Sequence, residues 1–181
     1  AHAIAKSGYA LTSGSASAIY SGAHSFHFAS MSSEQSKGVL VAYASIHGNT
    51  AEVANKFAEI LRSKGAEKVV VCDLSRTDMS EAVEDAFRYS HLVVAAASYD
   101  GDVFPVMHDF LHHLAIKNYT KRRIGIIENG SWAPSAGRAM RAIIDTFKGV
   151  TVAESMVTIM SSLKDSDIPA LERLADEVLA E

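Results

Sequence analysis

The chain has 181 residues, 48% of them hydrophobic, and a formal net charge of −4. This is enough apolar material for one well-packed domain, and the mild acidity gives no bulk attraction to nucleic acid or acidic membranes, whose binders normally carry a basic face. No apolar run is long enough to span a bilayer, and the single cysteine cannot form an internal disulfide, so we expect a cytoplasmic protein with a reduced thiol.

Residues 1–38 differ from the rest of the chain. They are rich in Ser, Ala and Gly and show no sustained hydrophobic periodicity. Glycines and serines interrupt every stretch that would serve as the apolar core of a secretory signal. We therefore interpret them as a leader, tag or linker remnant, with Met31 as a plausible native start, and expect the domain itself to cover residues 39–181.

From residue 39 onward, short apolar runs alternate with amphipathic segments. The apolar runs predict strands over 39–44, 68–73, 91–97, 123–127 and 150–159, and the segments between and after them carry apolar residues at helical spacing. Asp78 is the expected cap of the second helix, and Asp167-Ile168-Pro169 is the expected start of the fifth. Such alternation predicts an α/β fold, a doubly wound five-stranded parallel sheet of order 2-1-3-4-5 with helices on both faces.

The first polar loop lies between the first strand and the first helix. A helix start exposes unpaired N–H groups, and hydroxyl groups beside them suit a phosphate monoester. The loop has no Lys or Arg, whereas a nucleotide-hydrolysing P-loop requires a lysine and a dinucleotide-binding loop requires three glycines. We interpret it as a neutral phosphate site, the alternative being an ordinary strand-to-helix turn. Its residues are Ser45, Ile46, His47, Gly48, Asn49 and Thr50.

Two further loops follow the third and fourth strands. In the predicted order, both come to the edge of the sheet where the first loop lies, because the strands are parallel. They contain the only tryptophan of the chain and a tyrosine, either of which could stack on a flat aromatic ligand. The alternative is two irregular loops without a ligand. The residues concerned are Ser98, Tyr99, Asp100 and Gly101 in one loop, and Asn129, Gly130, Ser131 and Trp132 in the other.

Taken together, the three loops resemble the FMN site of the flavodoxin family. The first loop is similar to the family pattern [ST]-x-[ST]-G-x-T, with His47 in place of the usual hydroxyl. The runs 95–100, 110–114 and 125–136 resemble, more narrowly, the flavodoxin domain of flavodiiron proteins (A-type flavoproteins), which reduce O2 or NO. This resemblance implies FMN as the cofactor, with the phosphate held by the first loop and the isoalloxazine ring bordered by the other two. No catalytic residue and no metal ligand is assigned.

The resemblance to flavodiiron proteins also implies partners. We expect an electron-transfer domain that relays electrons from a donor protein, such as rubredoxin or a reductase, to a diiron site outside this chain, with a homodimer as the implied assembly. A diiron ligand motif is absent from residues 1–38, so an excised or stand-alone flavin domain is expected. Two alternatives stay open: a stand-alone NAD(P)H:quinone reductase of flavodoxin-like fold, and an interaction module without flavin.

Three other patterns in the sequence bear on function. A two-component receiver domain needs carboxylates at the ends of strands one and three, where this chain has Ser45 and Ser98. The histidines at 108, 112 and 113 have metal-like spacing on one helix, but they lie off its apolar stripe and are predicted to face solvent. The basic run 121–123 is predicted to be a solvated turn, with docking of a redox partner as the alternative.

Overall fold

The computed structural model describes residues 36–180 of the chain. Its main sheet has five long parallel strands in the order β2-β1-β3-β5-β6. Counted among the long strands alone, this is the predicted order 2-1-3-4-5, and the predicted flavodoxin-like fold is confirmed. One additional short strand, β4 (Asp102–Val103), pairs antiparallel with the end of β3. The long strands are β1 (Ser36–Ala44), β2 (Val69–Asp73), β3 (Tyr89–Tyr99), β5 (Arg123–Gly130) and β6 (Thr151–Met160).

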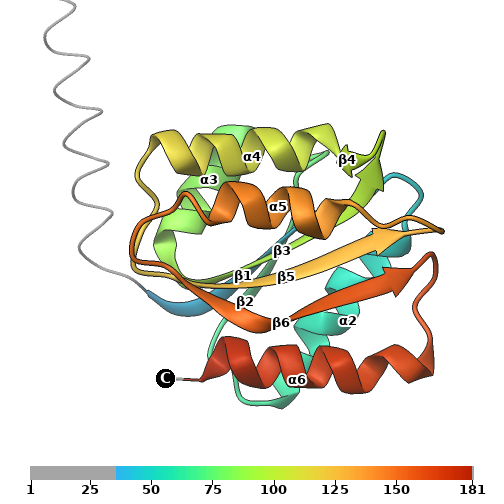
Figure 1. The fold of residues 1–181 in the computed structure, drawn as a ribbon. Helices are drawn as coiled ribbons and strands as arrows, with labels where there is room; N and C mark the ends of the chain where they lie inside the picture. The colour runs from blue at the N-terminus through green and yellow to red at the C-terminus, as the bar shows by residue number, and fades with distance from the viewer. Residues whose placement is uncertain (1–35, 181) are drawn as a thin grey trace, which may run out of the picture. The chain divides into compact units, whose positions relative to one another are not determined.

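Helices cover both faces of the sheet. Figure 1 shows α3, α4 and α5 on one face and α2 and α6 on the other. No helix in residues 36–180 has the length and apolar character needed to cross a membrane. The α-helices of this region are α2 (Asn49–Ser63), α3 (Met79–Arg88), α4 (Pro105–Ile116), α5 (Ala136–Ile144) and α6 (Ile168–Leu179), and a 3-10 turn, η1 (Asp165–Asp167), precedes the last of them.

The core lies on both sides of β1, β3 and β5. Residues 39–42 of β1 are at most 1% exposed, as expected for a central strand with helices on both faces. On the face covered by α2 and α6, Phe57 and Leu174 are fully buried against strand residues such as Ile127. Each such side chain contributes about 1.5–3 kcal/mol by leaving water, so the helical stripes explain why these helices dock on the sheet.

Two strands extend at least two residues further at their carboxyl ends than the sequence predicts. β3 continues to Tyr99 because it forms a hairpin with β4, in which Ser98 pairs with Val103. The two turn residues, Asp100 and Gly101, have φ of 49° and 77°, as a two-residue type I′ turn requires. β5 continues to Gly130 because its end stays paired with β6. The added residues carry both strands to the edge of the sheet where the polar loops meet.

The prediction for the basic run 121–123 is wrong for Arg122. Its side chain is buried, and its guanidinium donates to the carbonyl oxygens of Phe87 (2.6 Å), Tyr89 (2.8 Å) and Thr120 (2.8 Å). Burial lowers the pKa of this guanidinium, which is placed at the C-terminus of α3, where a cation is favoured. Arg122 is therefore a structural residue that fastens α3 to the start of β5.

The prediction for the α4 histidines agrees with the structure. His108 and His112 are exposed, and His113 is partly so. Residues 36–180 contain no group of three or more His, Cys, Asp or Glu side chains that could hold a metal ion. Asp78 caps α3 as predicted, accepting a hydrogen bond from the backbone N–H of Ser80 at 2.8 Å.

Candidate cofactor site

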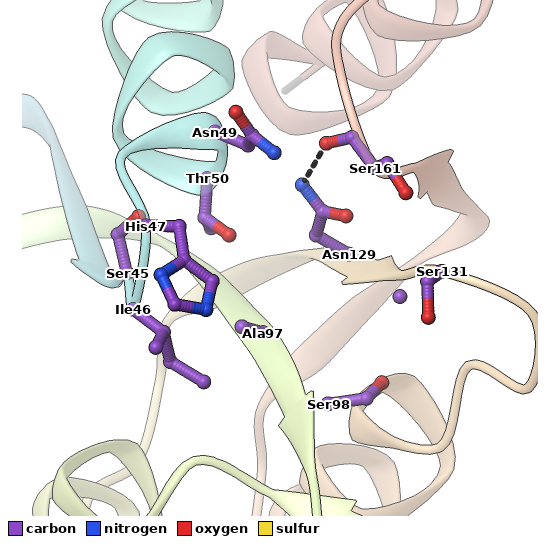
Figure 2. A pocket seen from close by; sticks show the side chains of 11 residues that line it. Ser45, Ile46, His47, Asn49, Thr50, Ala97, Ser98, Asn129, Ser131 and Ser161 are labelled. Carbon is purple, nitrogen blue, oxygen red and sulfur yellow. Dashed lines mark hydrogen bonds between the residues drawn. The ribbon is translucent and has the colours of Figure 1, made fainter.

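A pocket of about 260 Å³ opens at the carboxyl edge of the sheet. The carboxyl ends of β3 and β5, the loops that follow β1, β5 and β6, and the first turn of α2 form it (Figure 2). None of the lining side chains is a Lys, Arg, Asp or Glu. The lining residues are Ser45, Ile46, His47, Asn49, Thr50, Ala97, Ser98, Asn129, Gly130, Ser131 and Ser161.

The start of α2 forms one wall of the pocket. Its N-cap residue, Gly48, has φ of 94°, a conformation that glycine adopts at little cost. The Oγ of Ser45 accepts a hydrogen bond from the Gly48 N–H at 3.0 Å, which folds the loop back toward the helix. No side chain caps α2, whereas the side chain of Asp78 caps α3. The first-turn N–H groups of α2 are thus left for a ligand, and the helix dipole favours an anion there.

Thr50 lies at the bottom of this wall. The residue is only 2% exposed, and its hydroxyl is turned toward the pocket (Figure 2). Residues 36–180 contain no hydrogen-bond partner for this hydroxyl. The His47 imidazole also lies on the pocket side of the loop. A dianionic phosphate monoester fits this neutral donor set, because it would accept from the free hydroxyl and from backbone N–H groups.

The opposite wall comes from the ends of β5 and β6. The Asn129 Nδ2 donates to the carbonyl oxygen of Ser161 at 2.8 Å, and the Ser161 N–H donates to the carbonyl oxygen of Gly130 at 3.0 Å. These two bonds hold the two loops side by side. Ser161 and Ala97 line the pocket but were missed in the sequence. Ser161 could have been found from two consecutive serines that follow the fifth predicted strand, which is β6 in the structure. The other polar loops were chosen because they follow strands in the same way.

The structure brings together nine of the fourteen residues predicted to bind the cofactor. The other five are not in the pocket wall: Gly48, Tyr99 and Trp132 are each adjacent in sequence to a wall residue, whereas Asp100 and Gly101 form the β3–β4 turn beyond Tyr99. Tyr99 is 45% exposed, with its ring edge-on to Phe104 at 5.8 Å between centroids, and Trp132 is 88% exposed. Two exposed aromatic side chains therefore flank the pocket in sequence, one at the end of β3 and the other in the loop after β5.

Comparison with known proteins agrees with this geometry. The sequence model of the flavodoxin family matches residues 41–158, which includes all fourteen predicted residues. A search of curated proteins found no match. A flavodoxin from Streptococcus pneumonia TIGR4 is 27% identical with a TM-score of 0.67, and the alignment covers 78% of this chain and 97% of that one.

Longer proteins also share the fold. Rubredoxin oxygen:oxidoreductase from Desulfovibrio gigas aligns with a TM-score of 0.76 at 13% identity, over 89% of this chain and 39% of its own. The Flv1 flavodiiron core from Synechocystis sp. PCC6803 aligns with a TM-score of 0.71 at 16% identity, over 91% of this chain and 41% of its own. This chain thus spans about two fifths of these proteins. Because the family model covers most of the described domain and the loops at its binding edge, the chain belongs to the flavodoxin family, whose cofactor is FMN.

Proposed function

We propose that this protein binds FMN in the pocket at the carboxyl edge of the sheet and serves as an electron-transfer module. The observation that carries the proposal is the start of α2, where an uncapped helix and the unpartnered Thr50 hydroxyl converge on a pocket without charged side chains. These are the donors that a phosphate monoester needs. A site for a nucleoside triphosphate requires a lysine, and the pocket wall contains none.

Each loop has its own part in this proposal. The phosphate is held by Ser45, His47 and Thr50 together with the backbone N–H group of Asn49, while Gly48, whose N–H donates to Ser45, forms the turn that presents them. The isoalloxazine ring lies between the 98–101 and 129–132 loops, where Tyr99 and Trp132 are available for stacking. The bound flavin supplies the redox chemistry, and the protein supplies its position and electrostatic surroundings.

We further propose that the module belongs to a flavodiiron-type O2 or NO reductase. In this role it takes electrons from a donor protein such as rubredoxin or a reductase and passes them to a diiron site outside this chain, in a homodimer. The support is the sequence resemblance to flavodiiron proteins over 95–100, 110–114 and 125–136. The fold is also similar to that of two longer proteins, a rubredoxin oxygen:oxidoreductase and a flavodiiron core. A cytoplasmic location is proposed as well, supported by the buried free thiol of Cys72.

The test has two stages. The purified apoprotein is first titrated with FMN and followed by quenching of flavin fluorescence, and saturable one-to-one binding with a perturbed visible spectrum is expected. Failure to bind FMN would refute the proposal and favour an interaction module.

The holoprotein is then mixed with reduced rubredoxin in a stopped-flow instrument, in parallel with an assay of NADH oxidation by a quinone. Flavin reduction by rubredoxin without quinone-dependent NADH oxidation is the expected result. The reverse pattern would favour a stand-alone quinone reductase and refute the flavodiiron role.

A further inference from the structure

The N-terminus of α5 is held by side chains from two strands of the sheet. The Oγ of Ser98, on β3, accepts from the Ser135 N–H at 2.8 Å and from the Ala136 N–H at 3.1 Å. The carboxylate Oε2 of Glu128, on β5, accepts from the Gly137 N–H at 2.7 Å. Three consecutive N–H groups at the start of this helix are therefore occupied, in contrast to those at the start of α2.

Glu128 is a buried carboxylate, 6% exposed, with no cationic partner in residues 36–180. Its register partner on β6 is Thr158, whose hydroxyl donates to Oε1 at 2.7 Å. A buried charge needs such compensation, and here two hydrogen bonds and the positive end of the α5 dipole supply it. The site is closely packed, since a Cβ on Gly137 would come within 2.9 Å of the Glu128 carboxyl group.

The loop that these anchors close carries two of the predicted ring contacts. It runs from Gly130 to Ser135 and includes Ser131 in the pocket wall and the 88% exposed Trp132. At its start, Pro134 packs so closely on Gly130 that a Cβ there would lie 2.9 Å from the proline Cα. At its end, the helix is held by Ser98 and Glu128. Because the Trp132 side chain makes few contacts of its own, the position of its backbone depends on how the two ends of the loop are held.

We propose that Glu128 is a positioning residue for the flavin site, which acts by fixing the start of α5 and, through it, the loop that carries Trp132. The Glu128 side chain lies on the face of the sheet that α5 covers, whereas the side chain of the next residue, Asn129, lines the pocket. Neighbouring side chains of a strand point to opposite faces, so Glu128 points away from the pocket. Glu128 therefore acts through backbone and loop geometry, without touching the ligand. This inference rests on the proposed binding of FMN in the pocket.

The experiment uses Glu128→Leu, Glu128→Gln and, as a matched control, Glu172→Leu at an exposed glutamate of α6. Glu128→Leu removes both acceptors, and we expect the Kd values of FMN and of riboflavin both to rise about tenfold, because the loop must then be ordered when the ring binds. The two rise together because the ring end of the site is affected. Glu128→Gln can accept from Gly137 and bond to Thr158, so it should restore both affinities to within about twofold of the natural protein.

A second measurement reports the loop without any flavin. Trp132 is the only tryptophan of the chain, so its fluorescence anisotropy decay in the apoprotein reports the motion of this loop directly. We expect a larger fast component in Glu128→Leu, an unchanged decay in Glu128→Gln, and no effect of Glu172→Leu. If Glu128→Leu does not fold, Thr158→Val decides instead, because it removes one anchor of the carboxylate and should give the same changes at smaller size.

Unchanged riboflavin affinity together with an unchanged Trp132 anisotropy decay in Glu128→Leu, or in Thr158→Val if that variant has to decide, would overturn the inference. So would a Glu128→Gln variant as impaired as Glu128→Leu, because a loss that follows the charge alone would not be positioning. Absence of flavin binding by the natural protein is a separate outcome. It would refute the proposed function, while the anisotropy data would still test whether Glu128 holds the loop.

Discussion

Replacement of Thr50 by Val tests the phosphate site directly. Valine has nearly the shape of threonine but no hydroxyl, and Thr50 is 2% exposed, so the substitution removes one donor without opening a cavity. The hydroxyl has no partner in the described part of the chain, so no internal hydrogen bond is lost. A hydrogen bond to a charged group contributes about 1.5–3 kcal/mol. We therefore expect the Kd of FMN to rise about 10- to 150-fold.

Riboflavin makes this measurement specific. It has the same ring and side chain as FMN but no phosphate, so its affinity for Thr50→Val should equal that for the natural protein. Both affinities are measured by fluorescence quenching, and Thr50→Ser, which keeps the hydroxyl, serves as the control for side-chain shape. An unchanged FMN affinity, or an equal loss for riboflavin, would refute the placement of the phosphate at the start of α2.

Three further predictions concern stability and reactivity. Arg122→Met should lower the free energy of unfolding, measured by urea denaturation, by about 3–5 kcal/mol, because it leaves buried carbonyl groups unpaired. The control, Arg141→Ala at an exposed ion pair with Asp145, should lower it by at most about 0.5 kcal/mol. Similar losses in the two variants would contradict the role given to Arg122. Burial lowers the pKa of His91, so as the pH falls its imidazole is protonated in the unfolded chain before it is protonated in the folded one, and the free energy of unfolding should fall below about pH 6.5. His91→Gln should reduce this dependence of the free energy of unfolding on pH. An unaltered dependence would contradict the role given to His91. Burial also raises the pKa of the Cys72 thiol, so iodoacetamide at pH 8 should alkylate the folded protein at least about tenfold more slowly than the urea-unfolded protein, with equal rates as the contrary result.

Much of the pocket wall could be found from the sequence because the topology is simple. Parallel strands bring their carboxyl ends to one edge, so polar residues that follow different strands must meet there. Thr50, Ser98 and Asn129 are far apart in the chain, yet the structure places all three in one pocket. The same reasoning would have found Ser161 had the loop after the fifth strand been included.

The residues that hold the site together could not be recognised in this way. Arg122 is in a basic run that reads as a solvated turn, but it is buried because carbonyl groups 33 and 35 residues earlier surround its guanidinium. Glu128 has the sequence signature of an exposed acid at a strand end, yet its partner Gly137 is nine residues further along. Hydrophobic periodicity locates apolar faces and does not identify the hydrogen-bond partners of a charged group, and the second partner of Glu128, Thr158, is 30 residues away.

The amino-acid sequence by itself therefore determined the alternation of strands and helices, the order of the sheet and the neutral character of the phosphate loop. These follow from local periodicity and from residue types at helix starts. Only the tertiary structure decided which polar side chains face the pocket and which are buried as anchors. The physical reason is that the burial of a charged group depends on hydrogen-bond partners from distant segments, which come together only when the sheet has formed.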